Sequence, residues 1–521
     1  MKLSLIVLSL IIIFKESFVK IITQGLIAYC MLLGTSPIAN AANVSQEEIA
    51  AISVPNSVES SIGALNYQDG APTKETAEKL YDYVDLMHAV KAYNDNQAPA
   101  SMFAMRRGYQ SLGVHKSNQV IIHEKPQDAN AIYLVANSQT LYVFNFLDLK
   151  TDGPLVLESS PKTLGFLNSM WQTHIADIGV TGADKGKGGK YLILPPNYQG
   201  EVPKGYIVIR SPTYGIWYAS RGFLTNGNPE PSLSIIKNSL RIYPLAKANN
   251  PPKTEFIDAT GKQYNTVTRN DFQFFEDLNA VVQAEPIDSL GAERRGVLKA
   301  IGIEKGKQFS PDARMKGILT DAVNIGHGYF RALWWQPKDK ANASYPDDKN
   351  SHWMTGFPNR NTTFIEKGAM ELNSRLRMHG IGTGVTPAMS SVAAGKGSDY
   401  AFVFVDKEGE RFDGGQTYKL TLPANIPVAN FWSIIVYDAQ TRSYLPTSQS
   451  GAMLSSVFDG LKANADGSTD IYFGPKAPKG HESNWLETLP NKSWFICLRM
   501  YGPTEAWLNA TWRPSEIELL K

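Results

Sequence analysis

The chain has 521 residues, and its 51 basic and 49 acidic residues leave a formal net charge of +2. A chain of this length is too long for one hydrophobic core, so two or three domains are expected. The near balance of charge provides no general positive field, and no basic run interleaved with aromatic residues is present. Nucleic-acid binding is therefore not expected.

The composition is that of a folded globular protein, with 43% hydrophobic and 19% charged residues. Aromatic residues are abundant, with 10 Trp and 23 Tyr. Such residues supply core volume in β proteins, and they also line sugar and lipid sites. The core interpretation is favoured for most of them.

The N-terminus carries two apolar runs, residues 3–14 and 21–34, followed by the small-residue pattern Ala39-Asn40-Ala41. This arrangement predicts a signal peptide over 1–41 that is cleaved after Ala41, and hence export to the periplasm or the medium. Neither run reaches the roughly 20 residues of a membrane-spanning helix, so no stable transmembrane anchor is expected. A true start at Val19 would leave a single apolar run, while an uncleaved anchor at 3–14 is the weaker alternative.

The chain contains two cysteines, Cys30 and Cys497. Because Cys30 lies in the predicted signal peptide, the mature chain would hold one thiol and no intramolecular disulfide. Cys497 lies in an apolar strand-like run, where a small buried side chain is more common than a nucleophile.

After a polar segment over 42–71, for which we expect a flexible chain, helical spacing begins at Pro72 and continues to Tyr93. From residue 119 the apolar period approaches two, which predicts strands separated by turn residues. A helix is predicted within this region over 164–175, and another over 232–240. The predicted strands are residues 120–122, 131–135, 141–144, 155–157, 191–194 and 206–210.

The pattern becomes helical again between 271 and 336, within a segment of helices and connections over 248–395. One helix is expected to begin at Ser310-Pro311-Asp312, where a hydroxyl precedes a proline at the first helical position. Strand signals return over 396–521. The sequence thus predicts a mainly β fold with a helical insertion.

The sequence does not match the familiar catalytic and cofactor-binding motifs. The Gly-rich stretch 182–190 lacks the spacing of a phosphate-binding loop and precedes a strand, and the stretch 379–384 lacks the dinucleotide spacing. The eight histidines include no H-E-x-x-H motif, and no G-x-S-x-G motif is present. We therefore predict no metal and no cofactor, and no catalytic residue can be named.

Several polar residues lie in strand-like, apolar surroundings, notably Asn137, Arg221 and Arg499. A guanidinium inside a β-sandwich must be paired or must face a cavity. For the arginines, a buried ion pair is the favoured interpretation, and a clamp for an anion or carboxylate is the alternative.

Two stretches resemble known bacterial domains of unknown function. The first, over 131–247, carries Asn137-Ser138-Gln139-Thr140 and continues through Asp184 to Pro196 and Arg221-Gly222, and it resembles domain of unknown function 1254. The second, over 400–515, resembles domain of unknown function 1214. Its motifs are Phe431-Trp432-Ser433, Tyr437-Asp438, Asp466-Gly467-Ser468, Asn484-Trp485-Leu486 and Arg499-Met500-Tyr501.

The resemblance implies an N-terminal immunoglobulin-like sandwich within 72–247 and a C-terminal jelly-roll-like sandwich within 396–521. Many relatives carry an acidic residue where Gln139 stands, which weakens any scheme that needs a carboxylate there. The family supplies no established catalytic residue.

Three roles remain open, of which a purely structural role in the cell envelope is the third. The first is an exported protein that binds a small molecule or glycan in a cleft between the two β domains, and the second is a hydrolase acting on an ester, phosphate or glycoside at the same cleft. Nothing in the sequence specifies the ligand or the oligomeric state. The candidate ligand-binding residues are Asn137, Tyr142, Arg221, His379, Trp432, Asn484, Trp485 and Arg499.

Overall fold

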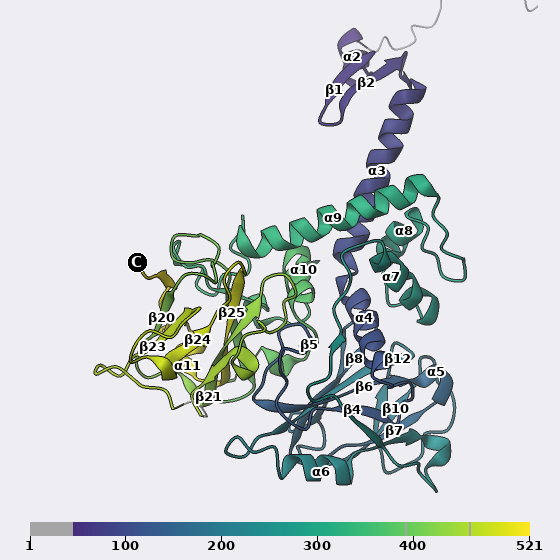
Figure 1. Ribbon diagram of the computed structural model, residues 1–521. Helices are drawn as coiled ribbons and strands as arrows, with labels where there is room; N and C mark the ends of the chain where they lie inside the picture. The colour runs from purple at the N-terminus through teal and green to yellow at the C-terminus, as the bar shows by residue number, and fades with distance from the viewer. Residues whose placement is uncertain (1–44, 391–392, 458–459) are drawn as a thin grey trace, which may run out of the picture. The chain divides into compact units, whose positions relative to one another are not determined.

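The computed structural model describes residues 45–390, 393–457 and 460–521 (Figure 1). These residues hold similar amounts of helix and strand, 27% and 28%, in several separate sheets. The expectation of β regions joined by helices is confirmed at this coarse level, although the chain holds more helix than predicted. The predicted signal peptide, its cleavage after Ala41 and the alternative start at Val19 lie outside the described residues.

The chain divides into two compact units, the second of which runs from Val84 to Lys521. Each unit is described by itself below. Among the helices of the described residues, none has both the length and the apolar character needed to cross a bilayer.

The first unit has regular secondary structure where we expected a flexible chain over 42–71. Its helix begins with a capping box, in which Ser45 and Glu48 satisfy each other's backbone N–H groups. Apolar and polar residues alternate for only a few positions around the buried Leu65, and this pattern was too short to predict strands. The elements are α2 (Gln46–Ile52), β1 (Ser57–Ser60), β2 (Gly63–Gln68) and β3 (Ala71–Pro72).

The first β region of the second unit consists of two sheets. One sheet has six strands in the order β14-β4-β6-β12-β8-β9, and the other has four in the order β11-β10-β7-β13. The bounds are β4 (Gln119–Ile122), β6 (Thr140–Asp148), β7 (Leu155–Glu158), β8 (Thr163–Ser169), β9 (His174–Gly179), β10 (Lys190–Leu194), β11 (Ile207–Arg210), β12 (Gly215–Phe223), β13 (Arg241–Pro244) and β14 (Glu255–Asp258). Shorter elements of this region are β5 (Ala131–Ile132), β15 (Tyr264–Asn265), α5 (Leu149–Asp152) and α6 (Ser232–Ser239).

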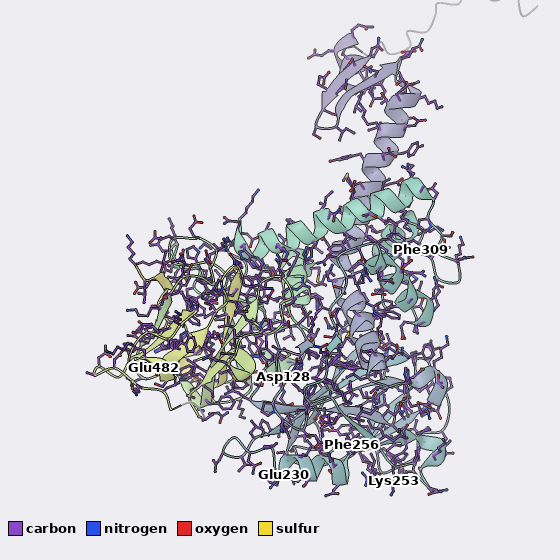
Figure 2. All side chains as sticks on the ribbon, viewed as in Figure 1. Asp128, Glu230, Lys253, Phe256, Phe309 and Glu482 are labelled. Carbon is purple, nitrogen blue, oxygen red and sulfur yellow. The ribbon has the colours of Figure 1, made fainter. Side chains whose placement is uncertain are left out.

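The two sheets share one core because strand residues alternate between faces. Leu141 and Val143 of β6 lie in the same cluster as Leu157 of β7 and Ile193 of β10. The other face of β6 carries aromatic side chains that join a different cluster. This second face is the one that forms the candidate site. Phe256, labelled in Figure 2, lies on β14 at the edge of the six-stranded sheet.

The prediction of a helix over 164–175 is wrong, because this segment forms β8 and β9. Phe166 pairs with Ala219 of β12 and with Asp177 of β9, so the segment is a sheet member on both sides. Gly165 lies close to β12, where an added Cβ would be 2.7 Å from the carbonyl oxygen of Ala219. Cross-strand pairing thus outweighed a local pattern that suited a helix.

Helices lie before and after the first β region. Asp312, rather than Ser310, caps α9, since its carboxylate accepts a hydrogen bond from the N–H of Met315 at 2.7 Å. Helix α10 packs against both α4 and α9. The bounds are α3 (Lys74–Asp95), α4 (Gln97–Ser111), α7 (Gln273–Ala284), α8 (Ala292–Ala300), α9 (Ala313–Trp335) and α10 (Leu372–Ile381).

The second β region also consists of two sheets that share a core, with the orders β16-β19-β25-β21-β22 and β24-β23-β20-β26. Cys497 is buried in β25, and burial raises the pKa of its thiol to about 12, so it remains protonated. The bounds are β16 (Met354–Thr355), β17 (Ile365–Glu366), β18 (Ala369–Met370), β19 (Ser398–Val403), β20 (Tyr418–Leu422), β21 (Val428–Asp438), β22 (Met453–Ser455), β23 (Thr469–Gly474), β24 (Trp485–Glu487), β25 (Trp494–Pro503), α11 (Glu505–Leu508) and β26 (Glu518–Leu519).

Two glycines of α9 provide a matched test of helix packing. A Cβ at Gly326 would overlap the ring of Tyr93 in α3, whereas a Cβ at Gly328 would meet nothing within 4 Å. We expect Gly326→Ala to lower the free energy of unfolding by about 1–3 kcal/mol through overpacking. Gly328→Ala should raise it by about 0.5–1 kcal/mol, because alanine restricts the unfolded chain. Urea unfolding of both variants measures this difference, and a stabilising Gly326→Ala would contradict the close packing.

Candidate functional site

The loop between β5 and β6 connects the two β regions. The N–H of Val135 donates to the carbonyl of Arg442 at 2.9 Å, and the hydroxyl of Ser138 donates to that of Tyr444 at 2.9 Å. The hydroxyl of Tyr437 donates to the carbonyl of Ala136 at 2.6 Å. Several hydrogen bonds between residues about 300 positions apart therefore hold this loop against the second β region.

Gln139, at the position where many relatives carry an acid, also joins the two regions. Its amide Nε2 donates a short hydrogen bond to the hydroxyl of Ser455 on β22. The side chain therefore acts in the contact between the β regions, where its amide group is buried.

Arg499 of β25 holds the same loop from the other side. Its Nη2 donates to the carbonyl of Val135 at 3.1 Å, and its Nη1 donates to that of Ala136 at 3.2 Å. The guanidinium carbon also lies 5.1 Å from the ring centroid of Tyr400. Val135 has a positive φ of 38°, which is unfavourable for a β-branched residue. The hydrogen bonds from Arg499 offset this backbone strain.

A cavity lies beside this loop, between the two β regions. The space in it that the centre of a water-sized sphere can occupy is about 60 Å³, and the wider hollow, which includes solvent at its opening, encloses about 720 Å³. Its wall is built from the loop, the six-stranded sheet, the five-stranded sheet and the helical segment between them. The lining residues are Tyr133, Leu134, Val135, Ala136, Asn137, Tyr142, Phe144, Phe166, Trp217, Ala219, Ser220, Arg221, Gly356, Phe357, Met378, Thr383, Met389, Tyr400, Phe402 and Arg499.

Strand alternation explains which residues of the first β region reach the cavity. On β12, Trp217, Ala219 and Arg221 are two residues apart and therefore share a face. The register places Arg221 directly opposite Tyr142 on β6. A cation and a phenol thus stand side by side on an otherwise aromatic and aliphatic wall.

The second β region contributes in the same way. On β19, Tyr400 and Phe402 share a face, and the register pairs Tyr400 with Arg499 on β25. The opposite face of these strands belongs to the sandwich core, which includes Ala401 and Leu498. The cavity therefore lies between the outer faces of two sheets, one from each β region.

The side chain of Arg221 has no hydrogen bond or ion pair with any residue that the structure describes. It is half-buried and lines the cavity. Burial lowers its pKa, but the hydroxyls of Tyr142, Tyr400 and Tyr501 outweigh burial and leave the pKa above its usual value. Arg221 is therefore a permanent positive charge with no partner within the described chain.

The favoured interpretation of Arg221 and Arg499 as members of buried ion pairs is wrong. In the described parts of the chain, neither guanidinium lies within ion-pair distance of a carboxylate. Arg499 donates to backbone carbonyls instead, because the positive-φ turn of the loop directs two of them toward it, while its Nε is buried without a hydrogen-bond partner among the described residues. Arg221 is left to face the cavity, and the alternative interpretation, a clamp for an anion or carboxylate, stays a prediction.

Four of the eight candidate residues come together at the cavity, namely Asn137, Tyr142, Arg221 and Arg499. The backbone N–H and the Nδ2 of Asn137 donate to the hydroxyl of Tyr142, at 3.2 and 2.8 Å. Asn137 thereby positions the tyrosine, while its own carbonyl oxygen accepts from the N–H of Gln139 at 2.9 Å.

The other four candidates do not line the cavity. Trp432 lies in the core of the second β region, because its strand position faces away from Arg499. Asn484 bonds the backbone of Lys462 and Asp470, and the Nε1 of Trp485 donates to the carbonyl of Gly474 at 2.9 Å. These contacts give both residues structural roles within one region.

His379 is buried in α10, next to the lining residue Met378 but outside the lining itself. Burial lowers its pKa to about 3, and the charges of Arg375 and Arg294 lower it further. The imidazole is therefore neutral and enclosed, and it offers no accessible general base.

Sequence reasoning missed most of the apolar wall. Phe166 was assigned to a helix, and Trp217 was not among the candidate residues. Met378 and Phe357 come from the helical segment, whose contribution to the cavity has no signal in the local sequence. The period-two spacing of Trp217 and Arg221 was the available signal for a shared face.

The described residues contain no group of three or more His, Cys, Asp or Glu side chains arranged to hold a metal. Asp and Glu are absent from the described residues that line the cavity, as are His and Cys. What the lining offers is a guanidinium, several phenols and an extended aromatic surface.

The fold and the cavity define a chain of two β regions joined by helices with a site between them. The family model described as protein of unknown function (DUF1254) matches residues 117–244, and that of DUF1214 matches residues 397–505. The chain therefore pairs these two domains in N- to C-terminal order, as its motifs predicted. Among curated proteins, no match was found.

Two solved structures resemble the chain. The VPA0106 protein from Vibrio parahaemolyticus is 18% identical with a TM-score of 0.51, covering 84% of this chain and 100% of that chain. An uncharacterized protein from Burkholderia cenocepacia is 12% identical with a TM-score of 0.39, covering 84% of this chain and 96% of that chain. The first similarity concerns the fold alone.

The two arginines should differ in their effect on stability. We expect Arg499→Gln to lower the free energy of unfolding by about 2–4 kcal/mol, because it leaves the buried carbonyls of Val135 and Ala136 without donors. Arg221→Gln should change it by less than about 0.5 kcal/mol or raise it, since no described residue loses a partner. Urea unfolding of both variants tests this, and an equally destabilising Arg221→Gln would assign Arg221 a structural role.

His379 should make the stability depend on pH. Because its pKa falls from the usual 6.5 to about 3 on folding, the unfolded chain binds a proton that the folded chain does not, and stability falls as pH falls from 6.5 toward 3. Replacing it in His379→Gln should make the slope of unfolding free energy near pH 5 shallower by about 1.4 kcal/mol per pH unit. Urea unfolding over this range measures the slope.

The matched control is His115→Gln, because His115 is exposed. This variant should leave the slope as it is in the unaltered chain. A slope that His379→Gln does not change would mean that the folded protein already binds a proton at this position.

Proposed function

We propose that this protein binds a small molecule in the cavity between its two β regions. One observation carries the proposal: side chains from both β regions and the helical segment enclose a space in which the Arg221 guanidinium has no partner within the described chain. Binding sites are concave, mostly apolar and furnished with a few polar groups, and the lining has this character.

The alternative of a hydrolase has less support. Hydrolysis of an ester, phosphate or glycoside requires a general base, a nucleophile or a metal within reach of the substrate. The described lining offers neither a carboxylate nor an imidazole nor a thiol, and His379 is neutral and enclosed. Binding is therefore the function that we put forward.

We also propose export with cleavage after Ala41, on the basis of the two apolar runs and the Ala39-Asn40-Ala41 pattern. N-terminal sequencing of the mature protein tests this, and a mature chain that retains residues before Ala42 would refute it. The periplasm is the proposed location, and detection in the culture medium alone would replace it with secretion.

We further propose that the first β region be classed as an immunoglobulin-like sandwich and the second as a jelly-roll-like sandwich. The support is that each region has two sheets with a shared core and mostly antiparallel pairing. Superposition of an experimental structure on sandwiches of both topologies tests the classification, and a different strand order would reject it.

Ligand binding can be tested by thermal unfolding of the full chain against a library of sugars, amino acids, aromatic acids and fatty acids. We expect at least one compound to raise the Tm of the unaltered protein. Ala219→Phe should abolish that shift, because Ala219 lies on the cavity wall between Phe144 and Phe166.

The control is Ala332→Phe, which adds the same side chain at an exposed position of α9. It should keep the shift. A shift that survives in Ala219→Phe would place the ligand elsewhere, and the absence of any shift across the library would reject the proposal.

A further inference from the structure

We propose that the ligand of this cavity is a carboxylate with an apolar body, whose carboxylate group pairs with Arg221. This inference rests on the proposed function and adds the chemical class of the ligand. It follows from the charge inside the cavity, from the hydrogen bonds that are already made there, and from the character of the remaining wall.

The cavity carries positive charge that no described side chain neutralises. Arg221 and Arg499 both line it, and none of the described lining residues is acidic. The charge of Arg499 repels that of Arg221 and acts to lower the pKa of Arg221. An unpaired charge removed from water is unfavourable, and an anion that enters the cavity would relieve this cost.

The hydrogen bonds already made inside the cavity indicate that the ligand should carry one negative charge rather than two. Arg499 already donates to the carbonyls of Val135 and Ala136 and to the hydroxyl of Tyr437, the last at 3.4 Å. The negative ends of these carbonyl dipoles stabilise its charge. Arg221 has no such contacts among the described residues, so of the two lining guanidiniums it is the one whose charge lacks a hydrogen-bonded partner there. A guanidinium pairs with carboxylate and with phosphate through two parallel hydrogen bonds, and a single unpaired guanidinium matches the one negative charge of a carboxylate.

A second donor lies close to Arg221. The hydroxyl of Tyr501 is buried without a hydrogen-bond partner among the described residues, and it interacts electrostatically with both Arg221 and Arg499. Its ring stacks on that of Phe431, with centroids 4.2 Å apart, which fixes its position. Tyr501 lies outside the lining itself, so the carboxylate assignment rests on Arg221.

The remaining wall suits an apolar body. Phe144, Phe166, Trp217 and Phe402 come from the two facing sheets, and Met378 adds a flexible side chain that adapts to shape. The hydroxyl oxygen of Tyr142 accepts from Asn137, and the hydroxyl of Tyr400 is within 2.8 Å of that of Ser398. Among the described lining residues, the buried polar side-chain atoms left without a partner are Trp217 Nε1, Ser220 Oγ and Arg499 Nε, which are few for the many hydroxyls of a glycan.

The test uses the full chain and pairs of probes that differ only in charge. Isothermal titration calorimetry would compare benzoate with benzamide and decanoate with decanamide at pH 7, with inorganic phosphate as a third kind of anion. We expect at least one carboxylate to bind at least tenfold more tightly than its amide, and phosphate to bind more weakly than that carboxylate. Comparison of the two pairs distinguishes an aromatic from an aliphatic body.

Variants then connect the charge preference to one residue. Arg221→Gln should weaken carboxylate binding by at least tenfold and remove the preference over the amide, whereas Arg221→Lys should retain part of it. Arg210→Gln is the matched control, because Arg210 is exposed on β11 and does not line the cavity. It should leave the affinity unchanged.

A measurement on the unaltered protein avoids any dependence on folding of the variants. Affinity for the carboxylate should fall as pH is lowered through the pKa of the ligand's own acid, while affinity for the amide should not follow that titration.

Equal binding of acid and amide, or unaltered binding by a folded Arg221→Gln variant, would overturn the carboxylate assignment and leave the proposed function standing. If library compounds raise the Tm but no carboxylate does, the assignment is likewise wrong; if nothing binds, both proposals fail.

Discussion

The hydrogen bonds from Arg499 to the carbonyls of Val135 and Ala136 are the constraint on which the site depends. They join a loop of the first β region to the central sheet of the second, and they hold a β-branched residue at positive φ. Because the guanidinium bonds to carbonyls rather than to a carboxylate, it brings no acidic side chain into the described lining of the cavity. The same contact therefore fixes the arrangement of the two regions and sets the charge of the space between them.

The two arginines show how similar residues acquire different roles. Both lie on strands, and both face the cavity from outer sheet faces. Arg499 has a structural role, because its Nη1 and Nη2 donate to backbone carbonyls of the loop. Arg221 stands opposite Tyr142 without a partner in the described chain. An unpaired guanidinium that is partly removed from water lowers the stability of the folded protein. Such unfavourable groups are common at sites where ligands bind.

Half of the candidate residues that were chosen from the sequence line the cavity. The residues Asn137, Tyr142, Arg221 and Arg499 were identified because polar groups stood in apolar strand patterns, and all four line the cavity. Trp432 was misplaced because aromatic residues on one strand alternate between faces, and the sequence does not say which face is the core. His379 was chosen for its glycine neighbours, but packing in α10 buried it. Burial of a helix residue depends on what packs against it, which no local pattern contains.

The sequence by itself determined the order of β, helical and β regions, the two family resemblances and the positions of strands such as β4, β6, β7 and β10, because hydrophobic periodicity and turn residues are local properties. The tertiary structure alone decided that β8 is a strand rather than a helix, since its partners on β9 and β12 override its local preference. It also decided which sheet faces meet across the cavity and which arginine keeps its charge unpaired. These outcomes depend on contacts between residues up to some 360 positions apart, and such contacts arise only when the regions pack together.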